Sequence, residues 1–292
     1  MAALKNYFVM SKTGIVVFVL IGGIVGYVFG MDPAGTFSLS HFSVMLFGLY
    51  FLSSGSFILN QVQESDIDSK MGRTSQRPLV LKRISAKFAE RLAVGFLILG
   101  LLLLQVSGEK TAWLGLATVV MYNGFYTMIW KPKWAFGAVP GAIPGAMPIV
   151  IGYAAISSEI FTMECVYLFL IMFLWQMPHF WAIAIKFKED YRRADIPVLP
   201  TNRGVPKTIY FIGLYTFAYV ALAIAAPMFV ETRAAYLVLV VPMAIKLLVE
   251  FFRYLFAVTD DRWFQFFIWT NISVLAFLLA PVVDKWQIFA GR

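Results

Sequence analysis

Three oxygen-bearing side chains recur at four-residue steps in the first long polar segment of the chain. Asn60, Glu64 and Asp68 are spaced i, i+4 and i+8, so on a continuing helix they share one face. Mg²⁺ binds proteins through one or two carboxylates and keeps waters or substrate phosphate oxygens as its other ligands. Asp66 points away from this face. The spacing therefore predicts a metal site in which Glu64 and Asp68 are ligands and Asn60 lies beside them.

Basic residues follow these acids directly. Arg73 and Arg77 lie a few positions downstream, and arginine binds phosphate oxygens through two parallel hydrogen bonds. Carboxylates that hold a metal, next to arginines that hold phosphate, favour a diphosphate substrate over either ligand alone. The alternative interpretation is a solvated loop whose arginines only reflect the charge bias of membrane proteins. The regular spacing of the acids argues against that alternative for the carboxylates.

A second constellation surrounds a histidine inside an apolar run. His179 directly follows Pro178 and precedes Phe180 and Trp181. An ionisable residue within a membrane span is a functional candidate by default, and imidazole is both a haem-iron ligand and a proton carrier near neutral pH. We interpret His179 as a haem-binding residue; the alternative is a structural histidine packed in the bundle. His41 starts a different apolar segment, away from the acids, and we interpret it as structural.

The polar segment that follows His179 carries charges of both signs. Lys186 and Asp190 are spaced i, i+4, and Arg193 lies one helical turn further on. This spacing places Lys186 and Asp190 on one helix face, from which both could face the first acidic set across a cavity. The alternative is a salt-bridged helix end at the surface.

The elements that must position these residues are membrane helices. Of the 292 residues, 60% are hydrophobic and 14% are charged, whereas soluble domains carry roughly 25% charged residues. Apolar runs long enough to cross a bilayer as helix, about 20 residues each, recur from end to end. We predict one membrane-embedded domain, 1–292, with nine transmembrane helices near 13–30, 41–62, 86–106, 111–130, 135–157, 162–185, 207–229, 233–252 and 263–283.

The two polar loops follow the second and the sixth of these helices, four spans apart. This repeat predicts two four-helix units around a central cavity that opens to the cytoplasmic side. Most of the 24 Lys and Arg residues fall on the side of these loops, so the positive-inside rule places that side and the N-terminus in the cytoplasm. The same bias explains the net charge of +8 without nucleic acid. The lipid bilayer is the predicted environment.

Two motifs resemble those of a known family. The segment from Asn60 to Leu79, with its MGRTSQRPL ending, and the segment WQMPHFWAIAIKFKEDYRRADIPVLP from Trp175 to Pro200 are similar to the two signatures of the intramembrane UbiA-type prenyltransferase superfamily. Glu64 in the middle acidic place and the Pro-His-Phe-Trp run are most similar to its haem-modifying branch, the haem o synthases. YTMIWKPK, from Tyr126 to Lys133, also resembles that branch. The strong resemblance covers roughly residues 60–200.

The resemblance implies Mg²⁺-dependent transfer of farnesyl from farnesyl diphosphate to a vinyl group of haem b, with addition of water and release of diphosphate. It implies a location in the bacterial plasma (inner) membrane, and a haem a synthase or terminal oxidase assembly factors as further partners. The residues it marks are the catalytic Asn60, Glu64, Asp68 and Asp190, with Glu64, Asp68 and Asp190 as metal ligands, the diphosphate-binding Arg73, Arg77, Lys131, Lys186 and Arg193, and the haem-binding His179.

Two other functions fit parts of the pattern. A prenyltransferase of a quinone precursor or another aromatic acid needs the acids and arginines but not the run around His179. A transporter accounts for the repeat and for polar groups within the membrane, yet it needs polar groups along both halves of a path. Here the charges cluster on one side, which favours the enzyme.

Overall fold

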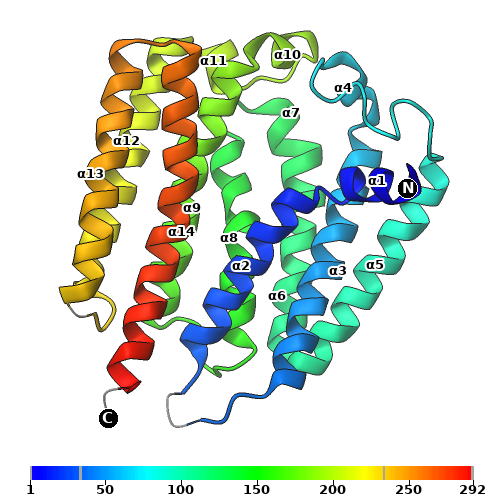
Figure 1. The fold of residues 1–292 in the computed structure, drawn as a ribbon. Coiled ribbons are helices and arrows are strands. Elements are labelled where there is room, and N and C mark those ends of the chain that lie inside the picture. Colours follow the sequence, from blue (N-terminus) through cyan, green and yellow to red (C-terminus); the bar gives the residue numbers. More distant parts are fainter. Residues whose placement is uncertain (1, 33–34, 233, 291–292) are drawn as a thin grey trace.

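The computed structural model describes residues 2–32, 35–232 and 234–290, and its regular elements there are all helical (Figure 1). The first half of the chain contains α1 (Ala2–Met10), α2 (Thr13–Gly30), α3 (Leu39–Gln63), α4 (Ser65–Lys70), α5 (Ala86–Ser107), α6 (Glu109–Val119), the π-helix η1 (Val120–Trp130) and α7 (Lys131–Lys133). The second half contains α8 (Ala138–Ala154), α9 (Met163–Lys186), α10 (Lys188–Arg193), α11 (Leu199–Asn202), α12 (Val205–Ile224), the 3₁₀-helix η2 (Ala226–Met228), α13 (Ala234–Phe256) and α14 (Asp260–Ala290).

Six of these helices are long and apolar enough to cross a bilayer, which confirms the prediction of a polytopic helical membrane protein. They are Thr13–Gly30, Leu39–Gln63, Ala86–Ser107, Met163–Lys186, Val205–Ile224 and Asp260–Trp286. The other three predicted spans are helical as well, but they differ from simple apolar helices. α6 passes into η1, α8 has 17 residues, and α13 carries Lys246, Glu250 and Arg253. As membrane spans, these three remain predictions.

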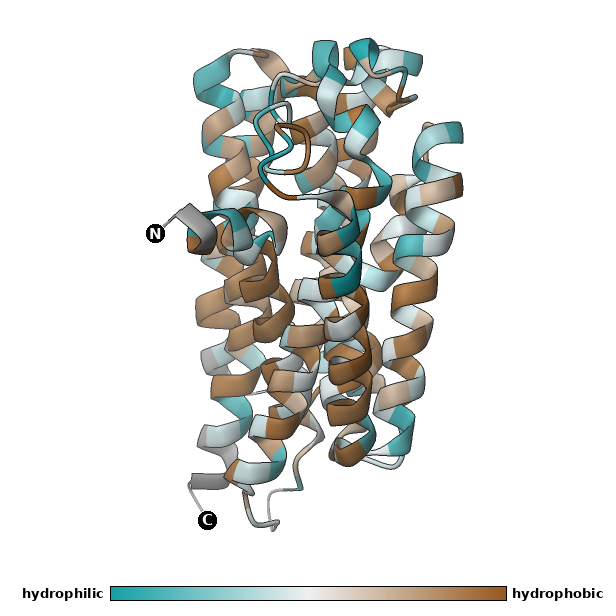
Figure 2. Cartoon of the chain, turned by 90° about the vertical axis from the view of Figure 1, so that its right-hand side faces the viewer, coloured by the Kyte–Doolittle hydropathy of each residue, from teal (hydrophilic) through white to brown (hydrophobic). Residues whose placement is uncertain are grey.

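The long helices run side by side, and the short helices lie at one end of the bundle. α4, α10 and α11 gather at that end, whereas α1 lies across the bundle on its outside (Figure 1). Apolar residues dominate the helix shafts, and polar residues concentrate where the loops after α3 and α9 lie (Figure 2). Large apolar side chains on α5 are exposed, which is the arrangement expected for a lipid-facing helix. They include Phe88, Val94, Ile98, Leu99, Leu102 and Val106.

The long helices pack in pairs, most of them close in the sequence and one, α2 with α8, distant. α3 packs on α5, α9 on α12, α13 on α14, and α2 on α8. The α2–α8 contact is the closest: a Cβ at Gly26 would lie 1.9 Å from the Ile149 carbonyl oxygen, and one at Gly152 would lie 2.0 Å from the Gly23 carbonyl oxygen. Small residues allow membrane helices to approach in this way. This contact brings the two halves of the chain together along the cavity described below.

His41 has the structural position expected from the sequence. Its backbone N–H donates to the hydroxyl of Ser38, the N-cap of α3, at 3.3 Å. Its Nδ1 lies 3.1 Å from the Tyr27 hydroxyl, and its Nε2 lies 2.9 Å from the Ser107 carbonyl oxygen. The histidine therefore links α2, α3 and α5 at the end of the bundle opposite α4 and α10.

Gly152→Ala should destabilise the protein, because the new methyl group would meet the backbone of α2 rather than a movable side chain. Overpacking of this kind costs about 1–3 kcal/mol, which a lower apparent melting temperature in detergent would record. Gly95→Ala is the control, because a Cβ there would have no heavy atom of another helix within 4 Å. Equal melting temperatures for the two variants would contradict the tight α2–α8 contact.

Candidate active site

The first acidic set lies where α3 ends and α4 begins. The Glu64 N–H donates to the Asn60 carbonyl at 3.0 Å, and the Asp68 N–H donates to the Glu64 carbonyl at 2.8 Å. The backbone therefore keeps helical spacing through the break at Glu64. Asn60, Glu64 and Asp68 are 1%, 3% and 3% exposed, whereas Asp66 is exposed. The three side chains spaced at four residues are thus buried together, and the acid between them faces water.

The two acids of this set are each paired with a cation from another segment. Glu64 Oε1 lies 2.5 Å from Lys131 Nζ of α7, and Asp68 Oδ2 lies 2.5 Å from Arg77 Nη1 of the loop after α4. Burial alone would raise the pKa of Glu64, but Lys131 and Lys12 outweigh it and hold the pKa below its ordinary value. Glu64 is therefore ionised at neutral pH, and both carboxylates lie beside a cation that also suits phosphate.

Asp190 brings the second motif into contact with the first. Its Oδ2 accepts the backbone N–H of Arg73 at 3.0 Å, and its Oδ1 accepts from the Arg193 guanidinium. Burial would raise the pKa of Asp190, but these hydrogen bonds and that of the Gly72 N–H lower it overall. A Cβ at Gly72 would lie 3.3 Å from Asp190 Oδ1, so the loop approaches the carboxylate closely at this residue.

An apolar cluster holds the two motif loops against each other. Its buried members come from both motifs and are Met71, Ala184, Tyr191, Ala194, Ile196 and Val198. Above it, the Arg73 guanidinium lies 5.2 Å from the centre of the Phe187 ring. The second motif thus contacts the loop that follows Asp68: the Thr74 hydroxyl donates to the Asp68 backbone carbonyl at 2.9 Å, while the adjacent Arg73 N–H donates to the Asp190 carboxylate.

Lys186 lies apart from this group. Its Nζ is 2.5 Å from Asp260 Oδ1 and 5.3 Å from the centre of the Trp263 ring, at the start of α14. The physical reason is a break in the helix: α9 ends at Lys186, and Phe187 has φ −106° and ψ 29° before α10 begins. The helical i, i+4 relation between Lys186 and Asp190 does not extend across this break.

Two groups that the sequence reasoning did not assign to the site surround Asn60. Lys12 Nζ donates to Asn60 Oδ1 at 2.6 Å, and Asn60 Nδ2 donates to the Thr127 hydroxyl at 3.0 Å. In the sequence, Lys12 counted only toward the positive charge that predicts the cytoplasmic side, because a lysine before a membrane span is typical of any cytoplasmic segment. Thr127 belongs to the π-helix η1, where its hydroxyl donates to the Tyr122 carbonyl. The sequence did offer a signal for Thr127. Asn123 and Thr127 are polar residues spaced four apart in an apolar span, which places them on one helix face.

The π-helix continues this polar contact along α3. The Ser56 hydroxyl donates to Asn123 Oδ1 at 2.5 Å, and Asn123 Nδ2 donates back to the Ser56 carbonyl at 2.9 Å. π-helical turns are rare and occur frequently at functional sites. Here the wider turn presents Asn123 and Thr127, both 4% exposed, to the α3 face that carries Ser56 and Asn60.

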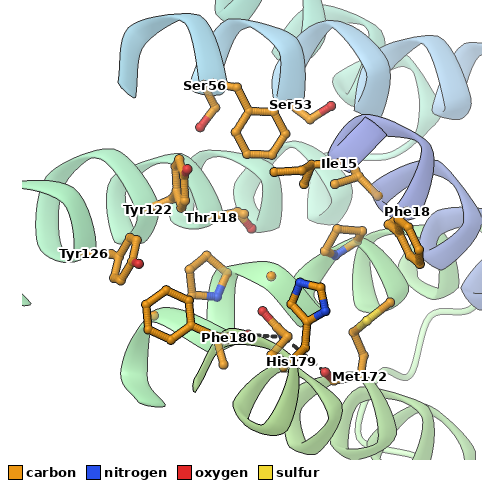
Figure 3. Close-up of a pocket in the computed structure, with 18 of the residues that line it drawn as sticks. Ile15, Phe18, Ser53, Ser56, Thr118, Tyr122, Tyr126, Met172, His179 and Phe180 are labelled. Atoms are coloured by element: carbon orange, nitrogen blue, oxygen red, sulfur yellow. Dashed lines mark hydrogen bonds between the residues drawn. The ribbon is translucent and has the colours of Figure 1, made fainter. Parts of the chain in front are cut away.

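A cavity of about 550 Å³ lies between the halves of the bundle, next to the polar cluster. Residues from α2, α3, α6, η1, α8, α9 and α14 line it, and most are apolar or aromatic (Figure 3). The Tyr122 and Tyr126 rings stack at 5.7 Å on its wall. Ser56 and Phe57 also line it, about one helical turn before Asn60. The charged cluster therefore lies beyond one end of an apolar chamber, as a substrate with a diphosphate head and a hydrocarbon tail requires.

His179 points into this cavity from α9 (Figure 3). Its ring lies between Trp175 and Phe267, with centroids 4.8 and 4.9 Å away. Its Nδ1 is buried and has no hydrogen-bond partner within the described part of the chain. Buried polar atoms are normally hydrogen-bonded, so an imidazole that lines a cavity and has an unpartnered nitrogen fits a group that interacts with a ligand.

The carboxylates suit a metal–diphosphate complex better than a bare metal ion. Within residues 2–32, 35–232 and 234–290, no three His, Cys, Asp or Glu side chains are grouped as a ready metal-ligand set. Mg²⁺ does not need one, since one or two carboxylates suffice when waters and phosphate oxygens complete the shell. Glu64, Asp68 and Asp190 supply donors of the right kind.

The chain is similar to known prenyltransferases along most of its length. The sequence profile of the UbiA prenyltransferase family matches residues 16–272. The protein named protoheme IX farnesyltransferase in Bdellovibrio bacteriovorus is 48% identical over 97% of both chains, and the one so named in Leptospira biflexa (strain Patoc 1 / Ames) is 35% identical over 94% of this chain and 97% of its own.

Solved structures show the same fold. A structure of digeranylgeranylglyceryl phosphate synthase matches with a TM-score of 0.77 at 20% identity, covering 97% of this chain and 99% of the other. A UbiA homolog from Archaeoglobus fulgidus, bound to DMAPP and Mg²⁺, matches with a TM-score of 0.65 at 18% identity, covering 94% and 99%. The match along most of the chain, together with the acidic motifs, shows that this protein belongs to the UbiA prenyltransferase family.

Proposed function

We propose that this protein is a haem o synthase, a protohaem IX farnesyltransferase. It transfers farnesyl from farnesyl diphosphate to a vinyl group of haem b, adds water, and releases diphosphate. The observation that carries the proposal is the hydrogen bond from the Arg73 N–H to the Asp190 carboxylate, which joins the two acidic motifs next to an aromatic cavity that His179 lines. The names of relatives at 48% and 35% identity support haem as the acceptor.

The ion pairs of the site suggest how it accepts its substrate. Asp68, Asp190 and Glu64 would hold Mg²⁺, which when bound neutralises the diphosphate and makes it a better leaving group. The cations now paired with these acids, Arg77, Arg193 and Lys131, would then turn to the diphosphate oxygens together with Arg73. In this exchange every buried charge keeps a partner, which avoids the large cost of an unpaired ion.

The chemistry follows from this arrangement. The C1–O bond of farnesyl diphosphate breaks, and the site's cations stabilise the charge that develops on the departing diphosphate. The allylic cation meets the cavity wall that carries Tyr122 and Tyr126, where ring faces stabilise positive charge and exclude water. A vinyl carbon of haem b then bonds to C1, and water adds to the new cation and loses a proton. Lys186, paired with Asp260, is the least direct of the proposed diphosphate contacts.

The proposal includes the membrane setting. The basic residues around the 63–85 and 186–206 segments would place the polar end of the bundle on the cytoplasmic side of a bacterial plasma membrane, with the N-terminus on the same side. Farnesyl diphosphate could then present its head group to the aqueous face and its chain to the cavity. The apolar helix shafts in Figure 2 support burial of the bundle in the bilayer.

Incubation of the purified protein with haem b, farnesyl diphosphate and Mg²⁺ should yield a haem product heavier by one farnesol unit in mass spectrometry. Asp68→Asn and Asp190→Asn should each lower kcat by about 100-fold or more, the scale seen when a charge-stabilising group is lost. Asp66→Asn is the control, because Asp66 is exposed beside the buried Asp68. Haem of unchanged mass, with an aromatic acid prenylated instead, would refute haem as the acceptor.

Lys131→Met should destabilise the protein by about 3 kcal/mol, because it leaves the buried Glu64 carboxylate without its nearest cation. The double variant Glu64→Gln with Lys131→Met should recover most of that stability while remaining inactive. Melting temperatures in detergent and the mass-spectrometric assay measure the two effects separately. A double variant as unstable as Lys131→Met would show that the ion pair does not couple these positions.

The same pair sets a pH dependence. Because the pKa of Glu64 is lowered in the folded protein, its stabilisation is complete above the ordinary carboxyl pKa and is lost as pH falls through the lowered value. Glu64→Gln should therefore lose less stability than the wild type on acidification through this range. Parallel loss in both proteins would assign the acid sensitivity to other groups.

His179→Ala should weaken haem b binding, because it removes the imidazole that lines the cavity. Titration followed by haem absorption should show a change in both affinity and the Soret band. His41→Ala is the matched control at the opposite end of the bundle and should bind haem normally. Unchanged haem affinity together with normal turnover in His179→Ala would remove this residue from the site.

A further inference from the structure

The corner between α1 and α2 fixes a lysine at the edge of the site. Gln61, 1% exposed on α3, donates from Nε2 to the carbonyls of Val9 and Met10 at 2.9 and 3.1 Å, and so caps the end of α1. The Tyr7 and Tyr50 hydroxyls add a contact at 2.5 Å between α1 and α3. Two side chains of α3, Gln61 and Tyr50, thus fix the end of α1 next to the corner.

Lys12 adopts a strained conformation at this corner. Its backbone has φ 50° and ψ 50°, the left-handed region that costs energy in a residue with a Cβ. Such strain persists where the surroundings over-determine it, and it clusters at ligand sites. The outcome here is that the side chain turns inward: its Nζ lies 2.6 Å from Asn60 Oδ1 and 5.5 Å from the centre of the Phe57 ring.

The surroundings of the Lys12 ammonium are those of the diphosphate site. Its charged neighbours are the acids Glu64 and Asp68 and the cations Arg77 and Lys131. Gly14 and Ile15, which follow it at the start of α2, line the apolar cavity together with Phe57. Lys12 therefore lies at the junction between the charged cluster and the chamber, where a prenyl diphosphate would join its head to its tail.

Lys12 differs from the other cations of the cluster in its partner. Arg77, Lys131 and Arg193 each contact a carboxylate, and must leave it before they can bind phosphate. The hydrogen bond of Lys12 goes instead to a neutral amide oxygen. A phosphate oxygen is a much stronger partner for an ammonium group than an amide oxygen, so Lys12 can move to the substrate without breaking an ion pair.

We propose that Lys12 is a diphosphate-binding residue, supplied by the N-terminal segment and held ready by the Asn60 amide. The inference rests on the proposed prenyl diphosphate substrate and adds a contact from a third part of the chain, outside both motifs. It also gives α1 a role, since the contacts of Gln61 and Tyr50 with α1 position the corner that aims Lys12. Asn60 thereby holds the Lys12 ammonium group until the diphosphate of the substrate replaces the amide as its partner.

The test compares Lys12→Met, Lys12→Gln and Lys12→Arg with Lys5→Met, which removes an equal charge from the exposed face of α1. Lys12→Met and Lys12→Gln should raise the KM for farnesyl diphosphate by about 10-fold or more, the usual scale for loss of a hydrogen bond to a charged group. Lys12→Arg should recover much of this loss, and Lys5→Met should match the wild type. The KM for haem b should remain unchanged in all four.

Calorimetric binding of inorganic pyrophosphate with Mg²⁺ gives a readout that does not depend on haem. Binding should weaken by the same factor in Lys12→Met and Lys12→Gln, at melting temperatures close to that of the wild type. Wild-type affinity in Lys12→Gln, which retains a polar group for Asn60, would overturn the proposal. So would equal weakening in Lys5→Met, which would reflect general surface charge. If the wild type bound pyrophosphate but left haem b unmodified, the proposed function would fail and Lys12 would still be tested.

Discussion

Burial of three carboxylates at one end of a membrane bundle is the constraint on which the site depends. An ionised carboxylate without a partner in a poorly solvated place costs several kcal/mol, so Glu64, Asp68 and Asp190 must each meet a cation or a set of N–H donors. Their partners come from separate segments: α7, the loop after α4, and α10 with the 72–73 backbone. Charge compensation therefore ties elements that are distant in the sequence into one polar end.

The same constraint accounts for a site that is stable without its ligand and still able to bind it. Carboxylates are metal ligands, and arginine and lysine are phosphate ligands. A cluster that neutralises itself through such pairs can exchange them for Mg²⁺ and diphosphate without creating an unpaired charge. The apolar side of the bundle is organised separately, by the close contact of α2 with α8 and by the aromatic cavity between the halves. Charge and hydrocarbon then meet near Phe57 and Asn60.

Asn60 lies where the charged cluster adjoins the apolar cavity. Its amide accepts from Lys12 and donates to Thr127, so a single side chain connects the N-terminal corner, α3 and the π-helix. The cost of a left-handed Lys12 and of a wide turn in η1 is compensated by these buried hydrogen bonds. Two of the places where local rules are broken, Lys12 and η1, lie beside the polar site, where such departures are expected.

Much of the architecture could be predicted from the sequence, because hydropathy and charge bias act locally and add along the chain. The runs of apolar residues mark helices, and six of the nine predicted spans meet the length and hydropathy that a bilayer requires. The acidic steps at Asn60, Glu64 and Asp68 and the two family motifs also appear in the sequence alone. So does the structural role of His41, which lies near the start of a helix, away from the two acidic motifs.

Only the tertiary structure decided which of these residues meet. A one-residue break at Phe187 turned Lys186 toward α14 and Asp190 toward the first motif, although helical periodicity put both on one face. Lys12 was indistinguishable from other cytoplasmic lysines until the α1–α2 corner directed it to Asn60. The physical reason is that periodicity describes a single helix, whereas the contacts of a site depend on where helices end, how closely they pack, and which buried charges must be neutralised.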